Sequence, residues 1–296
     1  MTGGGRQDFG PRPGNARRGG SRVLIDTHTH LGRLRHNDPG LTPRTLLARM
    51  DAHGIDRAVV LAVESPEEID YFVPTPAVLQ WCAQQPDRLI PFCACDPRHR
   101  YPGSFDAYPV LAEYVAAGCR GFGENLCGLP IDDPMQRRVY EACARLRLPV
   151  LLHLDHHINR DAVGLPGLER LLRDYPPITF IGHGPHFWRE ISAQVDPAQS
   201  YPGGAVVPGG RLDALLAEHP NLMADLSAGS GHNALARDPQ HALAFLQRHG
   251  DKLLFGTDVL AEAQELPIVE FFRNLPLRPE VREAIAWRNA VRLLRL

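Results

Sequence analysis

The feature that most constrains the fold is a repeated alternation of short apolar segments with helix-like segments along most of the chain. Each apolar segment predicts a strand buried on both faces, and such strands need helices on either side, as in a parallel sheet. Eight strands are expected, and the repeat of about 33 residues is close to the length of a strand–helix–strand unit. The sequence therefore predicts an α/β fold.

The predicted strands lie at 23–30, 57–63, 89–95, 119–124, 150–153, 178–183, 222–227 and 253–258. The predicted helices lie at 43–53, 77–85, 109–117, 134–147, 168–174, 212–218, 240–249, 268–274 and 280–294. The simplest arrangement of eight such units is a closed (β/α)8 TIM barrel. A doubly wound open sheet is the alternative, but no Gly-x-Gly-x-x-Gly motif follows an early strand.

Residues 1–21 differ from the rest of the chain because they are rich in glycine and arginine and offer almost nothing to bury. We predict that they form a disordered N-terminal tail. Residues 22–296 have a length that suits a single TIM-barrel domain. Hydrophobic residues make up 44% of the chain, which is enough for a sizeable core.

The formal net charge of −2 gives no electrostatic footprint for nucleic acid or an anionic membrane, so neither partner is expected. The sequence has no 18-residue apolar run and no signal-peptide core. Its six cysteines are scattered without a Cys-x-x-Cys pair, which is typical of free thiols in a reducing cytoplasm. A small-molecule substrate and a cytoplasmic location are therefore expected, with homo-oligomerisation left open.

Side chains of the metal-ligand type close five of the eight predicted strands. In a TIM barrel the active site lies at the carboxyl ends of the strands. A single His-x-His pair has little weight in a chain with fourteen histidines, but chance does not account for ligand-type residues at the same level on five strands. Imidazole and carboxylate together suit zinc, iron or manganese. The strand-end residues are His28, His30, Glu124, His153, His183 and Asp258.

These motifs resemble those of the amidohydrolase superfamily, in the same order along the chain. The matching residues are Asp26-Thr27-His28-Thr29-His30, His153, His183 and Gly256-Thr257-Asp258. The closing segment, Trp287 to Leu294, resembles the Asn-Ala-x-Arg-Leu end of the subgroup that includes aminocarboxymuconate-semialdehyde decarboxylase and related lactonases. The resemblance runs from about residue 22 to residue 296.

The resemblance implies that His28, His30 and Asp258 hold a divalent metal, with His153 binding the same ion or a second one. His183 would be a second-metal ligand or would polarise the substrate. Zinc is the expected metal, as one or two ions, with manganese and iron as alternatives. Such an ion lowers the pKa of bound water toward neutrality and polarises a scissile carbonyl. Asp258 would accept the proton of this water and pass it to the leaving group.

Glu124 decides between two branches of the superfamily. Many two-metal members carry a carboxylated lysine at the end of strand four, some carry glutamate there, and the decarboxylase-like members lack such a bridge. This chain has no lysine in that strand but has Glu124, and Gly121 and Gly123 leave room for close approach to it. We therefore expect Glu124 to bridge two metals, and the alternative is that it orients a histidine ligand.

His156, Arg189 and His232 are the candidate substrate-binding residues. His156 follows strand five, and Arg189 lies in a long Gly/Pro-rich excursion with the character of a lid. His232 lies in a small, polar stretch after strand seven that we expect to present backbone N–H groups to a substrate. Asp26 shares a face with the histidines but lies one level deeper, where it would orient a ligand or a neighbouring loop.

Four functions are compatible with this pattern. The first is a metal-dependent hydrolase of a C–O or C–N bond, such as a lactone, ester or amide, and Glu124 favours it. The second is a non-hydrolytic decarboxylase of a small unsaturated or aromatic acid. The third, a TatD-like metal nuclease, is disfavoured by the absence of a basic surface. The fourth, a barrel that only binds, is disfavoured because the ligand set is complete.

Overall fold

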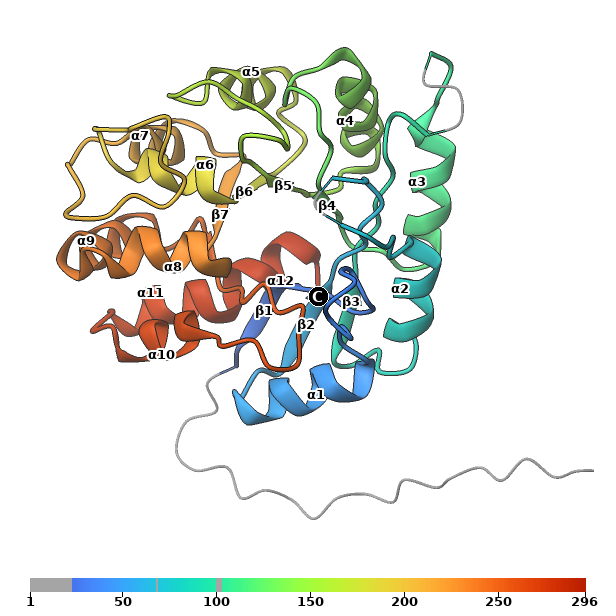
Figure 1. Cartoon of the computed structure of the whole chain (residues 1–296), viewed down its shortest axis with the longest axis horizontal. Helices are drawn as coiled ribbons and strands as arrows, with labels where there is room; N and C mark the ends of the chain where they lie inside the picture. The colour runs from blue at the N-terminus through green and yellow to red at the C-terminus, as the bar shows by residue number, and fades with distance from the viewer. Residues whose placement is uncertain (1–22, 68, 100–102) are drawn as a thin grey trace, which may run out of the picture.

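A computed structural model of the chain describes residues 23–67, 69–99 and 103–296. The predicted disordered tail, residues 1–21, lies outside these described residues. Eight parallel strands form a central ring, and helices surround the ring (Figure 1). The strands are β1 (Ile25–Thr29), β2 (Arg57–Val60), β3 (Leu89–Pro91), β4 (Phe122–Asn125), β5 (Val150–His153), β6 (Phe180–His183), β7 (Leu222–Asp225) and β8 (Leu253–Leu254).

The ring closes at two junctions between its two groups of strands. Strands β1 to β3 pair in order, and so do strands β4 to β8. Cys93, just after β3, forms a parallel bridge with Phe122 of β4. Thr29 of β1 bridges Val259 beyond β8, and the amide of Thr27 donates to the carbonyl of Phe255 at 2.9 Å. Because both gaps are bridged, the sheet is a closed barrel, and the TIM-barrel prediction is confirmed.

The helices follow the predicted alternation, with additions after β6 and β7. Helix α1 begins at Pro43, where the Thr42 side chain accepts from the amide of Thr45 at 3.2 Å. No helix among the described residues is long and apolar enough to cross a membrane. The helices are α1 (Pro43–Ala52), α2 (Thr75–Cys82), α3 (Ala107–Ala116), α4 (Pro134–Leu146), α5 (Pro166–Asp174), α6 (Pro185–Trp188), the 3₁₀ turn η1 (Arg189–Ile191), α7 (Arg211–Glu218), α8 (Ala228–Ala236), α9 (Pro239–His249), α10 (Pro267–Asn274), α11 (Pro279–Glu283), the π-helical turn η2 (Ala284–Arg288) and α12 (Asn289–Leu294).

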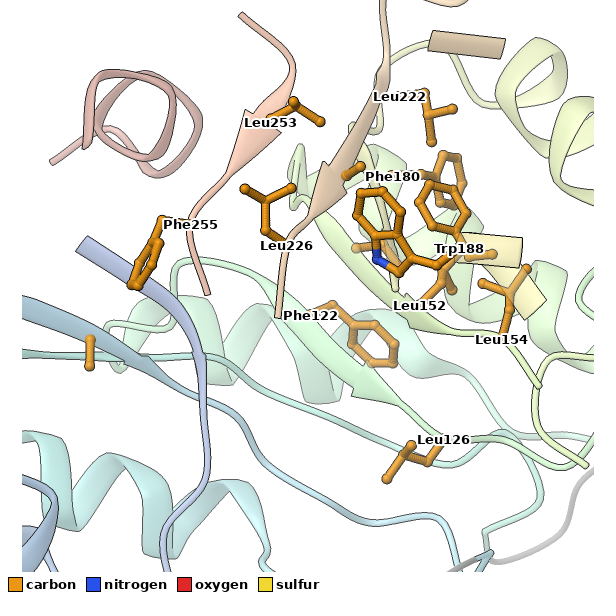
Figure 2. Packing of buried hydrophobic residues seen from close by; sticks show 14 of the residues in the cluster. Phe122, Leu126, Leu152, Leu154, Phe180, Trp188, Leu222, Leu226, Leu253 and Phe255 are labelled. Atoms are coloured by element: carbon orange, nitrogen blue, oxygen red, sulfur yellow. The ribbon is translucent and has the colours of Figure 1, made fainter. Parts of the chain in front are cut away.

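Alternation of side chains along the strands creates two hydrophobic layers. In β5, Leu151 packs in the inner cluster, whereas Val150 and Leu152 pack in the outer one. In β6, Ile181 likewise packs in the inner cluster and Phe180 in the outer one. The inner cluster fills the barrel, and the outer cluster lies between strands and helices. Figure 2 shows side chains of the outer cluster.

Helix α12 covers the amino-terminal mouth of the barrel. Its residues Ala290 and Leu294 belong to the inner cluster. The Asn289 side-chain amide donates to the carbonyls of Gly250 and Leu253, at 2.8 Å each, where β8 begins. The closing Asn-Ala motif of the sequence therefore seals this mouth, and the opposite, carboxyl-terminal mouth remains for chemistry.

Candidate metal centre

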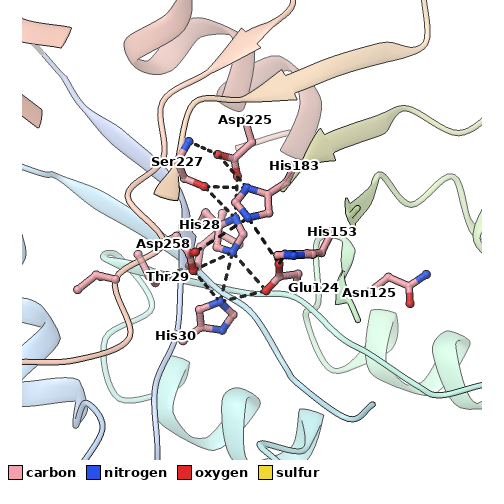
Figure 3. A network of polar contacts seen from close by, with 12 residues as sticks. His28, Thr29, His30, Glu124, Asn125, His153, His183, Asp225, Ser227 and Asp258 are labelled. Carbon is pink, nitrogen blue, oxygen red and sulfur yellow. Dashed lines mark hydrogen bonds and ion pairs between the residues drawn. The ribbon is translucent and has the colours of Figure 1, made fainter. Parts of the chain in front are cut away.

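The six strand-end residues predicted as ligands meet at the carboxyl-terminal mouth of the barrel (Figure 3). Strands β5 and β6 pair in register, which places His153 level with His183. The register between β1 and β2 shifts between Asp26 and Thr29, and the Nε2 atoms of His28 and His30 lie 3.2 Å apart. The sequence therefore folds with four histidines directed at one another.

The first donor group consists of four atoms: Nε2 of His28, Nε2 of His30, Oε2 of Glu124 and Oδ1 of Asp258. The two nitrogens lie 3.4 and 3.3 Å from the Glu124 oxygen, and 3.3 and 3.2 Å from the Asp258 oxygen. A tetrahedral ion with bonds of about 2.0–2.1 Å keeps its ligands about 3.3 Å apart. The spacing of these donors therefore fits a small divalent cation.

The second donor group lies on the other oxygen of Glu124. Oε1 of Glu124 lies 2.9 Å from Nδ1 of His153 and 3.7 Å from Nε2 of His183. This nitrogen of His183 is buried and has no hydrogen-bond partner among the described residues. Because a buried polar atom without a partner is costly, it favours a ligand at this position. The two oxygens of Glu124 thus face two separate sets of histidines.

Two side chains, one at the end of β7 and one just beyond it, lie behind the histidines and orient them. The Nδ1 atom of His28 lies 2.8 Å from Oδ2 of Asp225 and 3.2 Å from the Ser227 hydroxyl. The same hydroxyl lies 3.1 Å from Nδ1 of His183. When Nδ1 of His28 donates its proton to Asp225, Nε2 keeps its lone pair for the centre. Asp225 is therefore an orienting residue that the sequence prediction missed.

Asp26 performs the orienting role predicted for it. Its carboxylate accepts from the backbone N–H of His28 at 3.1 Å and from the N–H and hydroxyl of Thr257 at 3.0 and 2.6 Å. These bonds tie β1 to the segment that carries Asp258. The amide of Asp258 donates to the His28 carbonyl at 2.8 Å, and its φ of 57° is unusual for a residue other than glycine.

Asp155 fixes His153 in a similar way. Its Oδ2 atom lies 3.4 Å from Nε2 of His153, and its Oδ1 atom accepts from the amides of His157 and Ile158 at 2.6 Å each. The Asp155 carboxylate is therefore buried and paired with a strand-end histidine.

The pocket favours positive charge. Burial lowers the pKa of His28, but Asp258, Glu124 and Asp225 outweigh this effect and raise its pKa well above the usual value. Burial and the neighbouring His28 lower the pKa of His183 to about 4, so that imidazole is neutral. A site whose carboxylates attract protons also attracts a cation, which displaces those protons when it binds.

The three predicted substrate-binding residues lie outside this cluster of contacts. The exposed ring of His156 lies 5.9 Å from that of His186. Arg189 is only 5% exposed, and its Nη1 atom donates to the Pro197 carbonyl at 3.1 Å. The ring of His232 meets Phe271 edge-on at 5.7 Å. None of the three makes a hydrogen bond with a strand-end ligand among the residues that the structure describes.

The small, polar stretch after β7, for which no helix was predicted, is helical. Residues 228–236 form helix α8, which places His232 in the second turn of a helix. Gly231 has a packing role there, because a Cβ atom on it would lie 2.4 Å from the carbonyl oxygen of Leu226. The signal that could have identified Asp225 was its position, since Ala224 pairs with Gly182 and Asp225 is therefore level with His183.

Comparison with known proteins agrees with this geometry. The sequence model of the amidohydrolase family matches residues 25–296, nearly the whole chain. The chain belongs to the amidohydrolase family. No curated protein sequence matches it significantly.

Solved structures share the fold at low sequence identity. An uncharacterised TIM-barrel protein from Bordetella bronchiseptica is 18% identical, with a TM-score of 0.68 over 92% of this chain and 98% of that one. A putative 2-pyrone-4,6-dicarboxylic acid hydrolase from Pseudomonas putida is 21% identical, with a TM-score of 0.63 over 92% and 97%. A 5-carboxyvanillate decarboxylase from Novosphingobium aromaticivorans, complexed with manganese and a nitrobenzoic acid, is 15% identical, with a TM-score of 0.61 over 94% and 98%. This amidohydrolase therefore shares its barrel with both hydrolases and decarboxylases.

Proposed function

We propose that this amidohydrolase is a metal-dependent hydrolase that cleaves a C–O or C–N bond of a small molecule, such as a lactone, ester or amide. The observation that supports hydrolysis is the position of Glu124, whose two oxygens face two separate donor groups. His28, His30, Glu124 and Asp258 would hold one ion, and Glu124, His153 and His183 a second. Zinc is the first candidate for these nitrogen and oxygen ligands, with manganese or iron as alternatives.

A bound divalent ion would supply an acidified water and a polarised carbonyl. Asp258 is suited to move the proton because its side chain is 20% exposed, whereas that of Glu124 is 5% exposed. Burial raises the pKa of Asp258, but His28 and His30 lower it overall, so the carboxylate is ionised and has a lone pair for the proton of the attacking water. Asp258 would then deliver this proton to the leaving oxygen or nitrogen.

His183 would hold the second ion or polarise the substrate through its neutral imidazole. His156, Arg189 and His232 remain the proposed substrate contacts. They come from the segments after β5, β6 and β7, which in a TIM barrel border the active site.

Decarboxylation of a small unsaturated or aromatic acid is the second candidate function. The manganese-bound decarboxylase among the structural neighbours favours it. A decarboxylase of this kind needs no hydrolytic water and no bridging carboxylate, so the number of metals per chain separates the two proposals.

Metal analysis of the wild type and of Glu124→Gln tests the proposal. We expect two ions per wild-type chain and one in Glu124→Gln, because a neutral amide is a poor bridging ligand. Glu270→Gln is the matched control, since Glu270 is exposed, pairs with Arg273 on α10 and belongs to no group of possible metal ligands among the described residues. Equal stoichiometry in wild type and Glu124→Gln would disprove the bridge.

A panel of lactones, esters, amides and aromatic acids then assigns the reaction. Hydrolysis by the two-metal protein, lost in Glu124→Gln and retained in Glu270→Gln, is the expected result. Release of carbon dioxide by a one-metal protein, with no hydrolysis of any panel member, would replace the hydrolase proposal with the decarboxylase.

A further inference from the structure

An open cavity of about 1040 Å³ lies at the amino-terminal mouth of the barrel, opposite the metal centre. One wall is formed by residues that directly precede a strand, namely Pro149 before β5, Thr179 before β6 and Lys252 before β8. The other wall includes Arg292 and Leu293 of α12. Because the metal centre lies at the carboxyl ends of the same strands, the barrel core separates the two sites.

The charge of this cavity is unbalanced. Four cationic side chains line it, namely those of Arg147, Lys252, Arg292 and Arg295, and Asp251 is the one acidic residue among the lining residues. None of the four cations forms an ion pair within the described part of the chain. Lys252 and Arg292 donate to backbone carbonyls, those of His219 at 2.9 Å and Asp251 at 2.6 Å.

The guanidinium groups of Arg147 and Arg295 make no hydrogen bond or ion pair with any described residue, so they are available to a ligand. A concave wall focuses the field of such charges and raises the local concentration of anions.

The backbone at Arg147 and Arg295 is a second, independent observation. Arg147 directly follows the last residue of α4, and Arg295 directly follows the last residue of α12. Both have the left-handed backbone conformation, with φ of 53° and 55°. Glycine or asparagine adopts this conformation at lower cost and is the usual residue at such a position. Arginine at both helix ends, with both side chains lining one cavity, favours a role for the guanidinium groups over a role for the backbone.

We propose that this cavity binds a phosphorylated small molecule of about nucleotide size that carries at least two negative charges. Guanidinium groups bind phosphate oxygens through paired N–H donors. The volume is at the upper end of the range for small-molecule sites. Prolines and the side chains of Met223 and Leu293 provide an apolar wall for the uncharged part of the ligand. This proposal does not depend on the reaction at the metal centre.

Isothermal titration with inorganic pyrophosphate and with adenosine diphosphate tests the site at low ionic strength. The test variants are Arg147→Gly, Arg295→Gly and the double variant, because glycine suits the left-handed backbone and leaves the fold intact. We expect the double variant to bind at least about tenfold more weakly than the wild type, since each lost guanidinium removes a charge-assisted contact. Its Tm should equal or exceed that of the wild type, which a purely structural role of the arginines would not predict.

Arg44→Gln is the control for charge, because Arg44 is exposed on α1 and has no ion pair with a described residue. It should bind both probes like the wild type. The titration is repeated on protein stripped of metal with a chelator, since phosphates also bind metal ions, and the affinity should persist. The proposal is overturned if the wild type binds neither probe, if the double glycine variant binds as tightly as the wild type, if Arg44→Gln weakens binding equally, or if removal of metal abolishes it.

Discussion

Replacement of Asp225 by asparagine should weaken metal binding without changing any metal ligand. Asp225 and His28 are both fully buried, and Oδ2 of Asp225 lies 2.8 Å from Nδ1 of His28. Its other oxygen accepts from the Ser227 amide at 2.6 Å. An asparagine can offer its oxygen to only one of these two donors. If its NH₂ group faces His28, Nδ1 must accept and Nε2 must carry the proton, which removes the lone pair that a metal needs.

Loss of such an orienting carboxylate typically costs about 10–100-fold in metal affinity, or about 1.4–2.8 kcal/mol. Titration of the metal against a competing chelator measures this change. Asp213→Asn is the matched control, because Asp213 also pairs with a histidine, His249, but lies outside the centre. Metal affinity of Asp225→Asn within about threefold of the wild type would refute the assigned role of Asp225.

Three further predictions concern single side chains of the same mouth. Asp258→Asn should keep the fold and at least part of the metal but lower kcat by about 10²–10⁴-fold, and a near-normal kcat would exclude it as the proton carrier. His30→Ala should lose the metal of the first donor group, as measured by elemental analysis, with the second metal less affected. Burial and Arg189 lower the pKa of His186 to about 4, so the folded protein binds fewer protons than the unfolded chain between pH 6.5 and 4. Its free energy of unfolding should therefore fall as the pH falls through this range, and His186→Gln should reduce that slope in urea unfolding at pH 7 and 5.

The barrel and the meeting of the strand-end residues were predictable because both depend on local patterns. Continuous apolar runs identify strands that are buried on both faces, and the position of a residue at a strand end places it at the mouth. His153 and His183 show this most directly, since their strands pair in register and deliver the two histidines to the same level. No contact between distant segments had to be known for these predictions.

The missed features depend on contacts between segments that are far apart in the sequence. The predicted strand 253–258 is regular over only Leu253–Leu254, and Asp258, which was predicted at the centre, is held there by the bond from its amide to the His28 carbonyl rather than by the strand. Helix α8 was not predicted because a glycine that is required for packing against Leu226 resembles a glycine that is required for a turn. Asp225 was missed because its contact with His28 joins β7 to β1, which are far apart in the sequence.

Three carboxylates of one pocket differ in exposure, and this difference supports the separate roles proposed for them. The Asp225 side chain is fully buried and bonded to the far side of His28, so it can orient a ligand but cannot reach a substrate. Glu124 is 5% exposed and lies between the two donor groups, where both of its oxygens are engaged by histidines. Asp258 is 20% exposed and is the one of the three with access to a substrate proton. Since environment sets the role of a carboxylate, exchange of aspartate and glutamate at any of these positions should alter the chemistry even though the charge is conserved.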